Sequence, residues 1–119
     1  MNIRRVVPDI TTDRLDESRE FYTEFLGLKV AMDMDWIITL MSPSNETAQI
    51  NLLRGERSGN AHHDMGISFE VADVDAMHAM AVSRGLNIVY PLTDEPWGVR
   101  RFFVSDPNGV IVNIMNHIK

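Results

Sequence analysis

Cysteine is absent from this chain of 119 residues, and basic residues are outnumbered by acidic ones, 11 against 17. Without thiols there is no disulfide framework, no thiolate nucleophile and no sulfur ligand for a metal. The net charge of −6 argues against a nucleic-acid partner, which needs a basic face. No apolar run is long enough for a membrane span or a secretion signal. We therefore expect a cytoplasmic location, no membrane partner and no nucleic-acid partner.

The chain also lacks a nucleophile elbow, a phosphate loop and a dinucleotide fingerprint. Its strongest local pattern lies near the C-terminus. The segment Asp106-Pro107-Asn108-Gly109 has turn chemistry, because proline fixes φ while asparagine and glycine tolerate the left-handed region. The apolar, β-branched run 110–115 that follows predicts a strand, interrupted by Asn113. A buried amide must find hydrogen-bond partners or face a pocket.

Each half of the chain reads as a strand, a helix and three more strands. Asp16 and Asp73 are the expected helix N-caps, and Gly27 and Gly85 are expected to end the helices. The predicted strands are 6–12, 28–32, 36–41 and 48–53, then 66–71, 86–90, 98–104 and 110–115, with loops at 42–47 and 91–97. This order predicts an α+β fold built from a βαβββ duplication. Module one would span 1–57 and module two 64–119, with a polar linker at 54–63.

Two motifs point to a known family. They are Ser18-Arg19-Glu20-Phe21-Tyr22, and Pro96-Trp97-Gly98-Val99-Arg100 continuing to the Asp106–Gly109 turn. With the duplication, they resemble the vicinal oxygen chelate superfamily of glyoxalases, bleomycin-resistance proteins and extradiol dioxygenases. The resemblance implies a single domain over 1–119, with the sheets curled into half-barrels around a cleft and the helices on the convex face. It also implies a homodimer.

Metal-dependent members of that superfamily carry histidine or glutamate on the first and last strands of each module. The matching positions here are Val7, Asn51, Gly66 and Asn113, none of which is a usual ligand for a catalytic metal. Neighbours on the same strand faces include Asp9 and Asp64 but no histidine. The histidines lie elsewhere, at His62, His63, His78 and His117. We therefore expect no metal and no cofactor.

Strand alternation separates a helix-facing side from a cleft side. The side expected to pack on the helices contains Ile10, Ile50, Leu52, Ile67, Phe69, Val112 and Ile114. Asn51 and Asn113 either line the cleft or satisfy each other or the backbone. Arg101 and Phe103 are expected to face the cleft, whereas Arg100 is expected to pair with Asp106. The predicted ligand-binding residues are Asp9, Trp36, Asn51, Ser68, Trp97, Arg101, Phe103 and Asn113.

The resemblance and this cleft suggest a metal-independent small-molecule binding protein of the bleomycin-resistance type. It would sequester an aromatic or natural-product-like ligand in the cleft of a homodimer. Acidic residues such as Asp33, Asp35 and Glu95 would favour a cationic ligand if they converge. The alternative is a glyoxalase- or dioxygenase-like lyase or oxygenase with an atypical metal site, or a metal-free catalyst with Asp9 as acid and base. A regulatory or accessory module is a third hypothesis.

Overall fold

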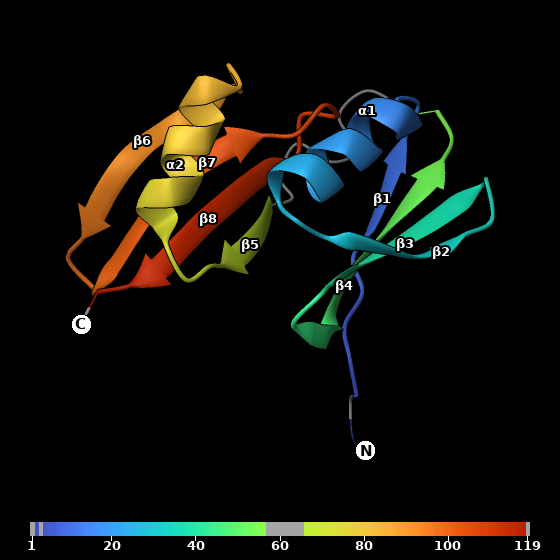
Figure 1. Cartoon of the computed structure of the whole chain (residues 1–119), viewed down its shortest axis with the longest axis horizontal. Helices are drawn as coiled ribbons and strands as arrows, with labels where there is room; N and C mark the ends of the chain where they lie inside the picture. Colours follow the sequence, from blue (N-terminus) through green and yellow to red (C-terminus); the bar gives the residue numbers. More distant parts are fainter. Residues whose placement is uncertain (1, 3, 57–65, 119) are drawn as a thin grey trace. The chain divides into compact units, whose positions relative to one another are not determined.

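A computed structural model describes residues 2, 4–56 and 66–118 (Figure 1). The chain separates into two compact units, 1–59 and 60–119, and each is described by itself. Both units contain one helical segment and a four-stranded mixed sheet. No helix in these ranges is long and apolar enough to cross a membrane. The predicted linker lies mostly outside the described residues, and Arg54 belongs to a strand.

The first unit has the predicted order of strand, helix and three strands. Its elements are β1 (Asp9–Thr12), α1 (Leu15–Glu20), η1 (Phe21–Phe25), β2 (Lys29–Asp33), β3 (Ile37–Ser42) and β4 (Asn45–Arg54). The sheet order is β1-β4-β3-β2, with β1 parallel to β4 and the other pairs antiparallel. Its core contains Ile10, Leu15, Phe21, Tyr22, Phe25, Ile38, Leu40, Ile50 and Leu52.

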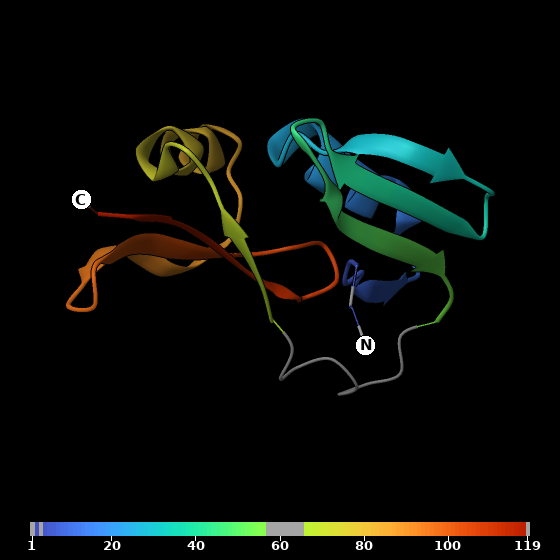
Figure 2. The same ribbon diagram turned by 90° about the horizontal axis from the view of Figure 1, so that it is seen from below.

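The second unit repeats this arrangement. Its elements are β5 (Gly66–Glu70), α2 (Val74–Ser83), β6 (Ile88–Glu95), β7 (Val99–Ser105) and β8 (Ile111–His117). The sheet order is β5-β8-β7-β6, which is the order of the first sheet shifted by one module. Figure 2 shows α2 lying across one face of its sheet. The predicted α+β fold and its βαβββ duplication are confirmed.

The predicted helix-facing side is largely confirmed by burial. Ile10, Ile50, Leu52, Val112 and Ile114 are all buried. Two others, Ile67 and Phe69, pair with Val112 and Ile114 and so share their face, yet they remain half-buried. Strand β5 is an edge strand, which leaves its residues covered from one side only.

The first helix differs from the prediction at its N-terminus, and its last turn is π-helical, although it ends before Gly27 as predicted. Its N-cap position is Arg14 and not Asp16, and no side chain of Arg14 caps it. Instead the Arg14 backbone N–H donates to Thr12 Oγ1 at 2.8 Å, and Thr12 Oγ1 lies 3.1 Å from Ser18 Oγ. The C-terminal part is a π-helical turn, η1, in which Leu26 N–H donates to the Phe21 carbonyl. These contacts tie the start of the helix to the end of β1, and the predicted aspartate cap is not formed.

Two predicted loops are wrong. The segment 42–47 is a tight turn at Pro43-Ser44, because β4 already begins at Asn45. The segment 91–97 belongs mostly to β6, which continues through Pro91 to Glu95. An edge strand tolerates proline, and the pairing with β7 shifts between Tyr90 and Thr93, as at a bulge.

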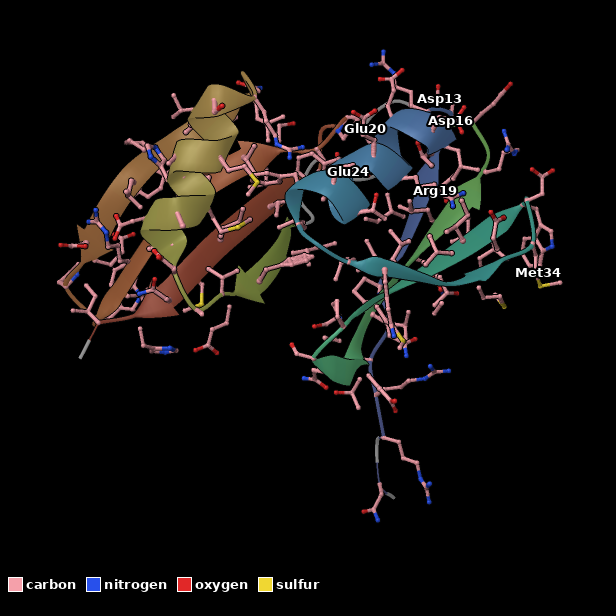
Figure 3. All side chains as sticks on the ribbon, in the orientation of Figure 1. Asp13, Asp16, Arg19, Glu20, Glu24 and Met34 are labelled. Carbon is pink, nitrogen blue, oxygen red and sulfur yellow. The ribbon has the colours of Figure 1, made fainter. Side chains whose placement is uncertain are left out.

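A carboxylate joins the first helix to β2. Asp33 accepts from the Asp35 backbone N–H and from Arg19, each at 3.0 Å. These bonds, the Asp35 N–H first and Arg19 second, lower the pKa of Asp33. Figure 3 shows Arg19 on the helix beside acidic neighbours that include Asp16 and Glu20.

We predict that the Asp33 side-chain carbon titrates, by NMR, with a midpoint below that of an ordinary aspartate. Because its folded pKa is depressed, Asp33 stabilises the fold above its unfolded pKa, and this contribution is lost as pH falls through the folded pKa. An Arg19→Gln variant should raise the midpoint only part of the way, since the Asp35 N–H remains. An ordinary midpoint in the unsubstituted protein would contradict the assigned hydrogen bonds.

Candidate ligand-binding site

In the second unit, the sheet face opposite α2 carries side chains in rows that cross the strands. Directly paired residues point to the same face. The first row is Ser68, Asn113, Phe103 and Tyr90, taken from β5, β8, β7 and β6. The next row is Glu70, Met115, Arg101 and Thr93. The opposite face carries Phe102, whose ring packs edge-on against His78 of α2, so the rows face away from the helix.

Asn113 holds an unusual position in the first row. Its Nδ2 donates to Ser68 Oγ at 3.0 Å. Its Oδ1 is buried and has no hydrogen-bond partner among the described residues. Rotating the amide by 180° exchanges oxygen and nitrogen but still leaves the atom remote from Ser68 unpaired. Phe103, the β7 neighbour of Asn113, has no donor to offer.

In the equivalent row of the first unit, the asparagine amide has hydrogen-bond partners for both its oxygen and its nitrogen. Asn51 on β4 lies between Asp9 on β1 and Thr39 on β3. Its Nδ2 donates to Asp9 Oδ1 at 2.9 Å, and Thr39 Oγ1 donates to its Oδ1 at 2.7 Å. Both halves of the Asn51 amide are therefore satisfied inside the unit. The two rows differ because phenylalanine stands at position 103 where the first unit has threonine at position 39.

Beside Asn113 lies a cluster that we call the Arg101 cage. The Arg101 guanidinium carbon is 4.8 Å from the ring centre of Phe103, 5.2 Å from Trp97 and 5.5 Å from Tyr90. Its Nε and Nη2 lie 2.8 Å and 2.7 Å from one oxygen of Glu95, Oε2. The Tyr90 hydroxyl donates to the same carboxylate at 3.1 Å. The cage thus combines three aromatic rings with a carboxylate that is only 8% exposed.

The structure brings together five of the eight predicted ligand-binding residues in the second unit: Ser68, Trp97, Arg101, Phe103 and Asn113. Asp9 and Asn51 lie together in the row of the first unit. Trp36 lies in the turn before β3, exposed and outside that row.

Sequence reasoning missed Tyr90, and it named Glu95 only as one of several acidic residues that would favour a cationic ligand. Both lie on β6, on either side of the register shift that lets two residues five positions apart meet on one face. Simple alternation would have placed them on opposite faces, so no periodic signal marks the pair.

The predicted pairing of Arg100 with Asp106 is wrong. Arg100 alternates with Arg101 and therefore points to the helix side, where it contacts Asp75 and Asp94 at 2.8 Å each. These contacts, Asp75 first, raise the pKa of Arg100. Asp106 instead accepts backbone N–H groups of its own turn, from Asn108 and Val110.

The described residues contain no cluster of side chains that could hold a metal ion, either at the four positions matched to metal ligands or elsewhere. In residues 2, 4–56 and 66–118, no three side chains of histidine, aspartate or glutamate lie together as a metal site would need. Glu70 and His117 form a pair at 3.0 Å, and both side chains are exposed. His62, His63 and Asp64 lie outside the described residues.

Comparison with known proteins places this geometry in a family. The model for the Glyoxalase/Bleomycin resistance protein/Dioxygenase superfamily matches residues 3–114. Among solved structures, TioX from Micromonospora sp. ML1 has a TM-score of 0.79 at 20% identity, over 96% of this chain and 98% of that one. A protein of unknown function from Agrobacterium tumefaciens str. C58 has a TM-score of 0.77 at 25% identity, over 99% and 97%.

A lactoylglutathione lyase from Agrobacterium tumefaciens has a TM-score of 0.74 at 16% identity, over 93% of this chain and 91% of that one. No curated protein matches. At such identities the likeness to TioX and to the lyase concerns the fold alone. The family match covers nearly the whole chain and agrees with the motifs around Phe21-Tyr22 and Asp106–Gly109. This chain therefore belongs to the Glyoxalase/Bleomycin resistance protein/Dioxygenase superfamily.

Proposed function

We propose that this protein binds a small aromatic organic molecule, without a metal, on the sheet face that carries Asn113 and Trp97. The observation that carries the proposal is Asn113 Oδ1, a buried acceptor with no partner in the described part of the chain. A buried acceptor without a donor costs about 1–3 kcal/mol. A ligand N–H or O–H that reaches this oxygen would recover that free energy. Neighbouring side chains must move to admit it, as side chains commonly do on binding.

Aromatic surface beside this acceptor supports the choice of ligand class. Trp97 packs one part of its indole on Arg101 and leaves 63% of its surface exposed. Phe103 is half-buried in the same row as Asn113. A planar ligand stacked on these rings would gain contact area, while Asn113 would fix its orientation. Rings and a directed acceptor together are typical of a site that selects organic molecules.

The enzyme alternative has weaker support. A lyase or oxygenase with an atypical metal site would need a cluster of ligands, and a metal-free catalyst would need an acid or base held against its substrate. The carboxylate suggested for that part is Asp9, which is exposed and accepts from Asn51 in a complete row. This is the environment of a structural carboxylate, so binding is the function that the geometry supports best.

A homodimer is part of the proposal. Strand β2 is an edge strand and is exposed over its whole length. Exposed large apolar side chains lie along it and the following turn, namely Val30, Met32, Met34 and Trp36. Figure 3 shows Met34 at the far end of the hairpin between β2 and β3. A second copy that covers this edge would remove this apolar surface from water. Contiguous exposed apolar patches usually mark such interfaces.

The test is a thermal-shift screen of aromatic compounds, including polyketides, cationic glycopeptides, thiol conjugates and catechols. A ligand of the folded state at 100 times its Kd should raise stability by about 2.7 kcal/mol. Trp97→Ala should abolish the shift, whereas Val89→Ala, which removes an exposed apolar side chain next to Tyr90 in β6, should keep it. Sedimentation of the same preparation should give a dimer.

Two outcomes would contradict the proposal. Stoichiometric zinc, nickel, manganese or iron in protein purified without chelators would end the metal-independent hypothesis. Ligand shifts that persist in Trp97→Ala would move the site away from this face.

A further inference from the structure

The burial and the hydrogen bonds of the Glu95 carboxylate are those expected of a group that binds a cation. Its side chain is 8% exposed, and a carboxylate so deeply buried is rare unless it is paired. Both Arg101 donors reach the same oxygen, Oε2, and not one oxygen each. The other oxygen, Oε1, contacts only the Tyr90 hydroxyl among the described residues, at 3.2 Å, and shares its single hydrogen with Oε2 at 3.1 Å. Strong arginine–carboxylate pairs use two parallel bonds to two oxygens, so this carboxylate has acceptor capacity left.

The aromatic rings around the Arg101 guanidinium are also suited to binding a cation. Tyr90, Trp97 and Phe103 all place their centres within 5.5 Å of the guanidinium carbon of Arg101. Proteins use such aromatic cages to bind organic cations, because each ring face attracts positive charge. Here the cage holds a cation that belongs to the chain itself. Arg101 is more exposed than the carboxylate it contacts, 24% against 8%.

We propose that Tyr90, Trp97, Phe103 and Glu95 form a cation-binding site that Arg101 fills in the free protein, and that the ligand brings a guanidinium- or amidinium-type group which displaces Arg101. The inference rests on the proposed function and narrows its ligand to aromatic organic cations. Exchange of one cation for another leaves Glu95 paired, so it avoids the cost of a buried unpaired charge. The net charge of −6 also favours the approach of a cation.

The tether makes Arg101 a competitor. A side chain held beside its partner acts at an effective concentration of about millimolar or above. A free cation must exceed that competition or add contacts that Arg101 does not make, such as stacking on Trp97 and a hydrogen bond to Asn113. Arg101 therefore sets the affinity that a ligand needs in order to displace it, which excludes simple amines and admits a larger aromatic cation. Removal of Arg101 should lower the affinity that is required.

The experiment uses benzamidinium and its neutral analogue benzamide as probes. Trp97 fluorescence is followed in a Trp36→Phe background, where it is the one tryptophan left. We expect Arg101→Ala to bind benzamidinium at least tenfold more tightly than the parent does, while benzamide binds at least tenfold more weakly than benzamidinium. Adding Glu95→Gln should remove this preference for charge. Arg101→Gln, which can still bond Glu95, provides a second variant if Arg101→Ala is poorly folded.

The outcomes separate this inference from the proposed function. Equal binding of benzamidinium and benzamide to both Arg101 variants, or no binding of either, would overturn the cation site. If neutral aromatic compounds then still shift the melting of the unsubstituted protein through Trp97, the proposed function stands without it. If Arg101→Ala is unfolded, refolding driven by benzamidinium but not by benzamide would support the site.

Discussion

Replacement of Asp106 by alanine is expected to lower the free energy of unfolding of the second unit by about 3 kcal/mol. The side chain is 4% exposed, and its Oδ1 accepts from the backbone N–H groups of Asn108 at 2.7 Å and Val110 at 2.9 Å. Val110 is itself buried, so its N–H has little access to water. Alanine would leave these donors without an acceptor at the turn that leads into β8.

A graded control distinguishes hydrogen bonding from packing. Asp106→Asn keeps an acceptor oxygen and nearly the same volume, so it should cost clearly less than alanine. Pro107→Ala changes the same turn without touching the acceptor and should cost about 1 kcal/mol or less. Urea unfolding followed by Trp97 fluorescence in a Trp36→Phe background reports the unit concerned. Equal losses for alanine and asparagine would show that the accepted bonds contribute little.

Local chemistry explains why some of the fold could be predicted. Gly27 and Gly85 end their helices at positive φ, 76° and 65°, which glycine adopts without a steric penalty. Asp73 caps α2 by accepting from the Ala76 N–H at 3.0 Å. These features depend on a few adjacent residues, and a pattern in the sequence contains them completely. The order of strands followed from the same signals repeated in each half.

The site depended on register, which sequence patterns do not contain. Ser68, Asn113 and Phe103 were each predicted to line the site, but their row appears only once β5, β8 and β7 are aligned. The cage needs the register shift in β6 that brings Tyr90 to Glu95. Arg100 and Arg101 are adjacent, and only the sheet decides which one meets the helix. Long-range pairing therefore determines chemistry that local propensity leaves open.

The two asparagines make a matched pair for the last prediction. Asn113→Val should raise the free energy of unfolding by about 1 kcal/mol, because it removes a buried acceptor that has no donor in the described residues. Asn51→Val should lower it by about 1 kcal/mol, because the amide of Asn51 is bonded on both sides. The same substitution at equivalent positions should therefore have opposite signs, measured as urea midpoints at constant m-value.

The Asn113→Val substitution should weaken ligand binding although it raises the free energy of unfolding. If a ligand donor meets Oδ1, Asn113→Val leaves that donor unpaired and should weaken binding by about tenfold or more. A polar side chain that lowers stability but strengthens ligand binding is typical of a binding site. If its role were only in folding, its polar atoms would be hydrogen-bonded within the fold. A destabilised Asn113→Val would mean that Oδ1 has a structural partner, as Nδ2 has in Ser68, and the argument for a ligand at this face would then fail.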